Sequence, residues 1–441
     1  MLNPAVKDRV IEKIDEQESG IIKFLQDLVK VPSISGEEGR AQDVVAERFR
    51  DVSNLKLDVW EPDLHELMKY PLYPLRSKPW SYKDRPNVVG VIDGGSNGRS
   101  LILNGHIDVV SAEPVAAWSH PPWSGMIESG RLYGRGAVDM KGGLAAMTYA
   151  AKCIIDAGIR VKGRLILESV VEEEYGGGGT IATLVRDYKA AAAIVTEGTG
   201  AQGICMGAGG SRFFTVNTLG KSEVAHLGHL GVNAIFLGSK LCHALSDLNE
   251  QRVKRLQGKH PLFEKKEIKS QLGTGRPTSL TLGIMRAGDW PSTVAGWVEI
   301  QGRVGFPPSE RGDDVVKEIE ETIIKTAQAD PWMKDHQPIV QWWGPRKEGY
   351  VLDSNEPLVQ TIKHYTDEIT EKNCDLYATP TNSDANYLAA KVGQYGGIPT
   401  IMYGPGGGNL HGADEYVLID EVITATKVLA LTILEWCGYE S

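Results

Sequence analysis

The chain has 441 residues, of which 41% are hydrophobic, and this is enough to build two or three domains with sizeable cores. Its 47 basic and 57 acidic side chains give a net charge of −10, and this balance, without any block of like charge, excludes a typical nucleic-acid-binding protein. No apolar run approaches the roughly 20 residues that span a bilayer, and the N-terminal segment lacks the apolar core of a signal peptide.

The first part of the chain alternates helical and strand-like patterns. Apolar residues recur at helical spacing over 7–29 and again up to about residue 51, and residues 61–84 form a loop rich in proline and aromatic residues. Because strands that alternate with helices are typical of α/β layers, we expect a mostly parallel sheet. The strands are predicted at 55–60, 87–92, 99–104, 161–170 and 190–196, and the later helices at 140–157 and 180–188.

The pattern changes at about residue 211. From there the segments follow the order β-α-β-β-α-β, which is the split unit of a ferredoxin-like layer. They are predicted at 213–218, 231–253, 279–285, 295–304, 313–327 and 338–343. We therefore predict a second domain, residues 211–345, inserted into a catalytic domain formed by residues 1–210 and 346–441. Helices at 357–370, 386–392 and 419–437 and a strand at 399–403 complete the catalytic domain.

Histidine and carboxylate side chains follow the apolar runs of the predicted catalytic domain. They are His106, Asp108, Asp139, Glu172, Glu173, Glu197 and His411. Because ligands bind at the carboxyl ends of strands in α/β sheets, we expect these side chains to reach the same edge. His106 and Asp108 are two residues apart and project together from an extended chain, which suits a metal-binding histidine supported by a carboxylate.

Two histidines and five carboxylates, with no thiolate, form a nitrogen and oxygen ligand set that suits zinc, manganese or cobalt. Clustered carboxylates without cations would repel one another and take up protons. One ion needs only three or four protein ligands, so the surplus indicates two ions that share a bridging carboxylate, roughly 3.5–4 Å apart. Such a pair activates a water molecule, and a carboxylate that is not a ligand can act as the general base.

Each residue also has a plain structural interpretation when it is taken alone. His106 fits a satisfied structural histidine, Asp139 fits the N-cap of the following helix, and residues 172–174 fit a solvated acidic turn. The glycine run 176–179 does not predict a phosphate loop, because no Gly-Lys-Ser/Thr follows it. The presence of all these groups at consecutive strand ends favours the metal centre.

Five segments of the chain resemble the dinuclear metallohydrolases that include acetylornithine deacetylase, succinyl-diaminopimelate desuccinylase, aminoacylase and the glutamate carboxypeptidases. The matching segments are 105–108, 134–143, 172–174, 196–198 and 404–411. The resemblance extends over nearly the whole chain. It implies an α/β catalytic domain and identifies the inserted domain with the lid and dimerisation domain of that family.

The resemblance also implies a role for each strand-end residue. It assigns the metal ligands as follows: His106 and Glu197 for one ion, Glu173 and His411 for the other, and Asp139 as the bridge. Glu172 would be the general base, and Asp108 would orient His106. A glutamate at position 197 resembles the deacylase branch, because relatives that act as aminopeptidases tend to carry aspartate there.

The chain departs from the family at positions expected to bind substrate. A lid histidine of many relatives aligns near Val224, although His226 stands close by and could fill its role. Relatives often carry an arginine where Asn386 stands here, and asparagine cannot form the bidentate charged fork. Arg303 matches a lid arginine. We therefore predict His226, Arg303 and Asn386 as substrate-binding residues for a substrate that is less anionic, or anchored differently, than N-acetylornithine or N-succinyl-diaminopimelate. The aromatic loop 70–82 would accept a flat or apolar group.

The sequence thus predicts a dinuclear metal-dependent amidohydrolase that cleaves the amide C–N bond of an N-acetyl, N-succinyl or N-formyl amino compound. We expect two divalent ions per subunit, with zinc first and manganese or cobalt as alternatives, in a homodimer formed through the lid domain. Five scattered cysteines without a CxxC pair predict reduced thiols in the cytoplasm, and no nucleic-acid or membrane partner is expected. Two enzymatic alternatives stay open: a metallo-carboxypeptidase or dipeptidase, and a hydrolytic deaminase or deformylase of a small aromatic amine. A non-catalytic binding protein is disfavoured, because every expected ligand and the base are present.

Overall fold

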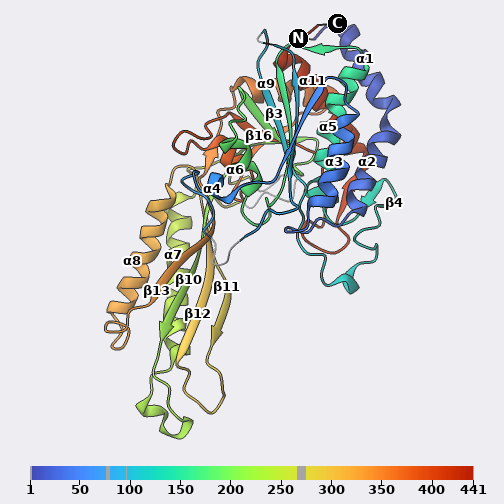
Figure 1. The fold of residues 1–441 in the computed structure, drawn as a ribbon. Coiled ribbons are helices and arrows are strands. Elements are labelled where there is room, and N and C mark those ends of the chain that lie inside the picture. Colours follow the sequence, from blue (N-terminus) through green and yellow to red (C-terminus); the bar gives the residue numbers. More distant parts are fainter. Residues whose placement is uncertain (1, 76–79, 96, 266–274, 441) are drawn as a thin grey trace.

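A large mixed sheet lies at the centre of the broader part of the molecule (Figure 1). Its strands are β1 (Leu55–Trp60), β2 (Asn87–Asp93), β3 (Leu101–His106), β7 (Arg164–Val170), β8 (Ala192–Val195), β9 (Gly203–Ala208), β14 (Tyr350–Val351), β15 (Asp375–Thr379) and β16 (Thr400–Met402). The computed structural model describes residues 2–75, 80–95, 97–265 and 275–440, and within them the strand order is β1-β2-β7-β3-β8-β16-β9-β14, with β15 also paired to β9. Strands from β7 through β3 and β8 to β16 are parallel, whereas β1, β2 and β14 pair antiparallel. The sheet is therefore mixed with a parallel centre, rather than mostly parallel as the sequence predicts.

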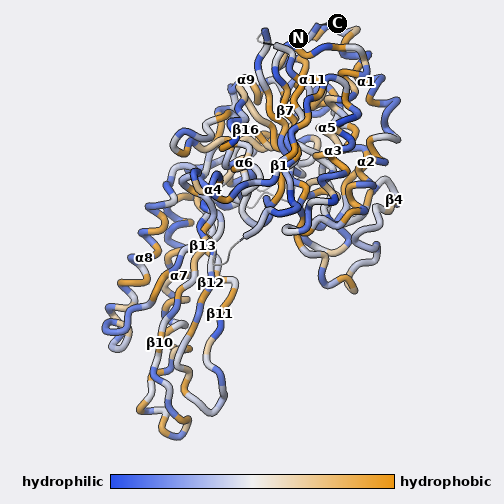
Figure 2. Tube along the Cα trace, in the orientation of Figure 1, coloured by the Kyte–Doolittle hydropathy of each residue, from blue (hydrophilic) through white to orange (hydrophobic). Residues whose placement is uncertain are grey.

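Helices cover this sheet on both sides. They are α1 (Pro4–Glu16), α2 (Glu18–Lys30), α3 (Gly39–Arg50), α5 (Gly142–Asp156), α6 (Gly178–Val185), α9 (Pro357–Thr370), α10 (Ala385–Ala389) and α11 (Ile419–Cys437). Helices α5 and α11 pack on each other and on β3, and α1 packs on both of them. Hydrophobic residues are concentrated in the central strands and on the helix faces that cover them (Figure 2), because each amphipathic helix buries its apolar side against the sheet. No described helix has both the length and the apolar character needed to cross a membrane.

A second, elongated unit extends away from the large sheet (Figure 1). It consists of β10 (Gly210–Leu219), α7 (Ala234–Leu256), β11 (Ser279–Ala287), β12 (Trp297–Phe306), α8 (Gly312–Gln328) and β13 (Ile339–Lys347). The strands form an antiparallel sheet in the order β11-β12-β10-β13, and α7 and α8 pack on one face of it around a separate hydrophobic cluster. The β-α-β-β-α-β order predicted from the sequence is confirmed. We refer to residues 210–347 as the four-stranded unit.

Short elements complete the fold around the sheet edge. They are α4 (Leu64–Leu67), β4 (Met126–Glu128), β5 (Arg131–Tyr133), the irregular helical turn η2 (Ala137–Lys141), the 3-10 helices η1 (Val115–Ala117) and η3 (Ala225–Leu230), β6 (Arg160–Val161), β17 (Gly407–Gly408), β18 (Tyr416–Leu418) and β19 (Tyr439–Glu440). The predicted loop 61–84 contains α4, and its residues 76–79 lie outside the described part of the chain. Trp80 of this loop stacks on Tyr175, with ring centroids 5.7 Å apart.

Glu168 is a fully buried carboxyl group on the central strand β7. It accepts hydrogen bonds from Asn104 Nδ2 at 2.9 Å and Thr183 Oγ1 at 3.3 Å, and burial raises its pKa to about 7. Because the pKa of this acid is higher in the folded than in the unfolded chain, the folded chain keeps the proton longer. The stability that Glu168 confers is therefore fully present below the pKa of the unfolded chain, and it is lost as the pH rises from there through about 7.

We expect Glu168→Gln to remove that pH dependence, because the amide cannot ionise. Relative to the wild type, the variant should gain about 3 kcal/mol of unfolding free energy between pH 4.5 and pH 8. Urea unfolding of both proteins at the two pH values measures this difference. An equal difference at both pH values would contradict the prediction.

Candidate metal centre

Two imidazoles meet one carboxylate where the parallel strands end. His106 is the last residue of β3, Asp139 lies in the turn η2, and His411 follows β17 in a glycine-rich loop. The Nε2 atom of His106 is 3.2 Å from Asp139 Oδ1, and the Nε2 atom of His411 is 3.1 Å from Asp139 Oδ2. Each oxygen of Asp139 therefore faces a different histidine, as expected of a carboxylate that bridges two ions.

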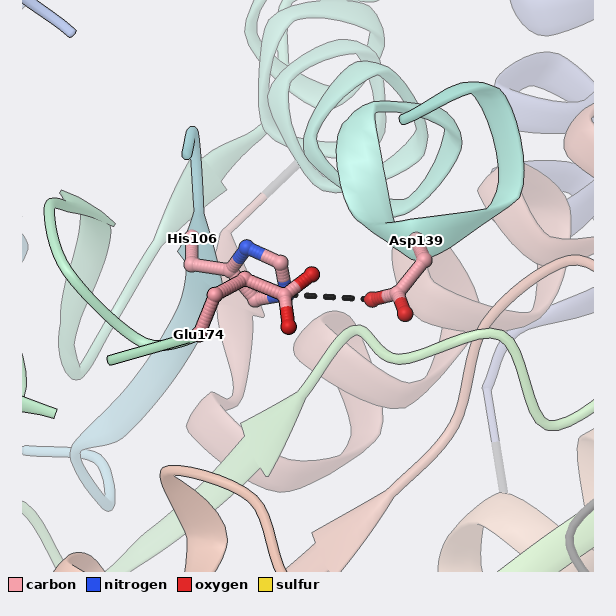
Figure 3. A group of neighbouring side chains, drawn as sticks. All are labelled: His106, Asp139 and Glu174. Atoms are coloured by element: carbon pink, nitrogen blue, oxygen red, sulfur yellow. Dashed lines mark hydrogen bonds and ion pairs between the residues drawn. The ribbon is translucent and has the colours of Figure 1, made fainter. Parts of the chain in front are cut away.

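One further carboxylate lies on each side of Asp139. Glu174 Oε1 is 3.3 Å from His411 Nε2, and Glu197 Oε1 is 4.0 Å from His106 Nε2. Figure 3 shows His106, Asp139 and Glu174 directed toward a common point, where one ligand atom of each lies within 4.8 Å of the other two. Distant segments of the chain thus place one imidazole and one carboxylate on each side of Asp139: His106 with Glu197, and His411 with Glu174.

The electrostatics of this cluster fit a site built for cations. Burial and the charge of Asp139 raise the pKa of Glu174 to about 7 and that of Glu197 well above its usual range. Hydrogen bonds to Asp139 and Glu174 raise the pKa of His411 to about 10. In the protein alone, protons therefore balance the crowded carboxylates. Divalent cations would take the place of these protons, and the nitrogen and oxygen donors suit zinc, manganese or cobalt.

The turn after β7 determines which of the three consecutive glutamates line the cavity. Glu172 has a φ angle of 67°, and its carbonyl accepts hydrogen bonds from the backbone of Gly176 and Gly177, so the chain turns sharply at this residue. The Glu172 side chain is fully buried and does not line the cavity beside Asp139, whereas Glu173 and Glu174 do. The two glutamates at the cavity are therefore Glu173 and Glu174, one residue later in the chain than the predicted pair of base Glu172 and ligand Glu173.

Asp108 connects the residues on both sides of the site. Its carboxylate accepts hydrogen bonds from Ser35 Oγ at 2.6 Å and from the backbone N–H groups of Glu173 and Glu174 at 2.9 and 3.2 Å. Its backbone carbonyl lies 2.8 Å from His106 Nδ1, and its carboxylate is 3.6 Å from the same atom. Asp108 is thus placed to orient His106, and it also fixes the backbone that carries the two glutamates.

Glu415 fixes the turn that carries Asp139, a role that the sequence analysis missed. Its buried carboxylate accepts hydrogen bonds from the backbone N–H groups of Gly136, Val138 and Asp139 and from Arg135 Nη1 at 2.6 Å. In the sequence Glu415 is one glutamate among many, and it lies in a predicted loop where no pattern marks it as buried. Its position four residues after His411 was the one available hint.

We expect Glu415→Gln to destabilise the fold by about 3–5 kcal/mol, because Arg135 would remain buried without a charged partner. Loss of the support for Asp139 should also weaken metal binding by about 10- to 100-fold. Urea unfolding and a metal titration measure the two effects. Glu16→Gln, which removes an exposed partner of Lys13, is the control and should change stability by less than about 1 kcal/mol. Unchanged metal affinity in Glu415→Gln would contradict the supporting role.

A cavity of about 300 Å³ opens beside the carboxylates, which is the lower end of the usual size of small-molecule sites. It is lined by Asp139, Glu173, Glu174, Glu197, Gly198, Thr381, Asn382, Ser383, Met402, Leu410 and His411. The part of the wall away from the metal centre consists of small polar and apolar side chains. Among the described residues that line it, none is a lysine or an arginine that would pair with a negatively charged substrate group.

The structure corrects the prediction that Asn386 binds substrate. Its side chain is buried, and Nδ2 donates hydrogen bonds to the carbonyls of Gly209 at 2.9 Å and Glu348 at 2.8 Å. Its Oδ1 atom accepts from the backbone N–H of Ser383. Both donor hydrogens are therefore used by the two segments that join the four-stranded unit to the rest of the chain.

The other two predicted substrate-binding residues lie on the four-stranded unit. Arg303 is a residue of β12, and its guanidinium lies 5.8 Å from the centre of the Phe213 ring. It is not among the described residues that line the cavity. His226 belongs to η3, at the end of the unit that is far from the large sheet (Figure 1). Neither residue is among the described residues that line the cavity of this chain, and their roles in substrate binding stay predictions.

Comparison with known proteins supports the architecture seen here. Peptidase family M20/M25/M40 matches residues 102–435 of the chain. An N-formyl-4-amino-5-aminomethyl-2-methylpyrimidine deformylase of Halalkalibacterium halodurans is 29% identical over 455 residues, and the match covers 99% of this chain and 99% of the relative. The dipeptidase Dug1p of Saccharomyces cerevisiae has a similar fold, with a TM-score of 0.73, 14% identity and coverage of 98% of both chains. A dinuclear metal-binding peptidase from Bacillus subtilis gives a TM-score of 0.63 at 12% identity, with 96% of this chain and 99% of that one covered.

Proposed function

Because the chain belongs to Peptidase family M20/M25/M40, and is therefore a hydrolase, we propose that it releases formate from a small N-formyl amino compound with a planar aromatic group. The observation that carries this proposal is the full-length similarity to a relative named as a deformylase of an N-formyl aminomethylpyrimidine. The solved structures of peptidases are similar to this chain at low sequence identity, and this similarity shows the fold alone.

The lining of the cavity supports an uncharged substrate. A carboxypeptidase or dipeptidase must bind a free carboxylate, and an arginine or lysine would serve that purpose. The described wall offers Thr381, Asn382 and Ser383 for hydrogen bonds and Met402 and Leu410 for apolar contact instead. Tyr175, which follows Glu174 in the chain, stacks on Trp80 and offers an aromatic surface next to the cavity residues in sequence. These groups favour a neutral, flat amine component over a dipeptide.

In this proposal His106 and Glu197 would hold one divalent ion, His411 and Glu174 would hold the other, and Asp139 would be shared between them. Zinc suits this donor set best. When bound, the two ions supply a lowered pKa for the attacking water and polarisation of the substrate carbonyl. Asp108 and Glu415 hold the residues that carry the ligands in place. The five cysteines are free thiols, which supports a cytoplasmic location.

Glu173 is the proposed general base. It lines the cavity, and the ligand pairs on either side of Asp139 do not require it. Its carboxylate takes a proton from the attacking water and gives that proton to the nitrogen of the leaving amine as the C–N bond breaks. The products are formate and the free amine, so that one water molecule is consumed for each amide bond.

A substrate panel tests the proposed reaction. The panel contains N-formyl, N-acetyl and N-succinyl derivatives of one aminomethylpyrimidine, together with a neutral dipeptide. We expect the N-formyl compound to give the highest kcat/KM. A dipeptide that is cleaved faster than every acylated amine would contradict the proposal and favour the peptidase alternative.

The domain division and the dimer belong to the same proposal. Residues 1–210 and 346–441 would form the catalytic domain, and 211–345 the lid. Apolar side chains are exposed on α7 and on the edge strand β11, namely Ile235, Phe236, Ile284 and Met285, and their exposure supports dimerisation through the lid. Light scattering should give twice the mass of one chain, and a mass of one chain would contradict this part.

A further inference from the structure

Lys347 reaches the metal centre from the four-stranded unit. It is the last residue of β13, and its side chain is only 2% exposed. Its Nζ atom donates a hydrogen bond to Glu173 Oε1 at 2.8 Å. Lys347 thus forms a buried ion pair with the Glu173 carboxylate. Neither the sequence patterns nor the resemblance singled out this lysine.

The backbone of Lys347 is fixed from two sides. In the ladder between β10 and β13 it pairs with Ser211, and its carbonyl accepts a hydrogen bond from Arg212 Nη1 at 2.9 Å. The carbonyl of the next residue, Glu348, accepts a hydrogen bond from Nδ2 of Asn386, a residue of helix α10. The backbone that carries Lys347 is therefore hydrogen-bonded both to β10 of the four-stranded unit and, through Glu348, to α10 of the large-sheet part.

We propose that Lys347 is a positioning residue that holds Glu173 in the orientation needed for proton transfer. The hydrogen bond engages Oε1 and leaves Oε2 of the same carboxylate to accept the proton of the attacking water. A carboxylate without this partner could rotate about its side-chain bonds, and small displacements of a reacting group are costly to the rate. The inference rests on the proposed role of Glu173 as the base.

The position of Lys347 in the fold gives this contact a second consequence. Lys347 ends the strand that leads out of the four-stranded unit. The orientation of Glu173 therefore depends on the position of that unit relative to the large sheet. The two parts of the molecule are thereby coupled at the catalytic group itself. Asn386, which occupies a position where relatives often carry arginine, holds the backbone of this connection.

A double-mutant cycle tests the inference with the N-formyl compound as substrate. We expect Lys347→Met to lower kcat by about 10- to 100-fold, with KM and bound metal nearly unchanged, because only the orientation of the base is lost. Lys347→Arg should recover part of kcat. In a Glu173→Gln background, Lys347→Met should cause no further loss, since the lysine acts only through that carboxylate. Lys240→Met, which removes a lysine from a 2.6 Å pair with Asp330 on the four-stranded unit, is the matched control and should retain the wild-type kcat.

The outcomes separate the inference from the proposed function. Full kcat in Lys347→Met, alongside its loss in Glu173→Gln, would overturn the positioning role and leave the base in place. A raised KM with unchanged kcat would overturn it too, because the lysine would then bind substrate. Turnover retained in Glu173→Gln would overturn the proposed function itself. If Lys347→Met does not fold, Lys347→Arg keeps the buried charge, and the same cycle is completed with that variant.

Discussion

Substitution of the proposed base, Glu173→Gln, is expected to lower kcat by about 10²- to 10⁴-fold while the amount of bound metal stays unchanged. The amide has the shape of the carboxylate but cannot accept the proton of the attacking water. The side chain lines the cavity, and the proposed ligand pairs around Asp139 do not include it. Steady-state kinetics and metal analysis of the purified variant measure the two quantities.

Glu172→Gln is the matched control for this prediction. It makes the same chemical change one residue earlier, on a side chain that does not line the cavity. We expect kcat of this variant to stay within a few fold of the wild type once both proteins are shown to be folded. The reverse pattern, with turnover lost in Glu172→Gln and kept in Glu173→Gln, would restore the register predicted from the sequence.

Asp139→Asn should remove both metal ions and lower kcat by at least about 10³-fold. The two carboxylate oxygens of Asp139 face the two histidines, and a neutral amide is a poor bridge between cations. Metal ions supply several kcal/mol of stabilisation in such centres, and each 1.36 kcal/mol corresponds to a tenfold change in rate. Metal analysis by mass spectrometry and an activity assay provide the measurement.

Asp58→Asn serves as the control for Asp139→Asn, because Asp58 pairs with Arg186 at the surface of the sheet edge. That variant should keep its metal and its activity. Two ions retained in Asp139→Asn would show that this carboxylate does not bridge them, and the ligand assignment would have to be abandoned.

Long amphipathic segments made most of the fold predictable. The helix of residues 419–437 and the β-α-β-β-α-β order of the four-stranded unit follow directly from apolar spacing, since each element is long enough to show its period. Strands of two or three residues, such as β17 and β18, show no period and were missed. The predicted helix over 7–29 is two helices that meet at Gln17, because the apolar spacing continues across the break.

The metal centre could be predicted from residue types at strand ends, but the register of its glutamates could not. Residues 172–174 are three identical side chains, and a positive φ angle at the first of them leaves no trace in the sequence. Glu415 and Lys347 have a further reason for being missed. Glu415 acts through the turn at Asp139, and Lys347 acts through Glu173. In both cases the fold brings together residues that are more than 100 positions apart in the sequence. Asn386 was misassigned because its position was visible and its two carbonyl partners were not.

In our proposal, side chains from separate strand ends hold two cations next to Glu173. Anomalous X-ray diffraction from crystals grown with zinc, measured at the zinc absorption edge, tests it most directly. We predict two peaks per chain, one between His106 and Glu197 and one between His411 and Glu174, with Asp139 in contact with both. A single peak, or peaks away from Asp139, would contradict the account.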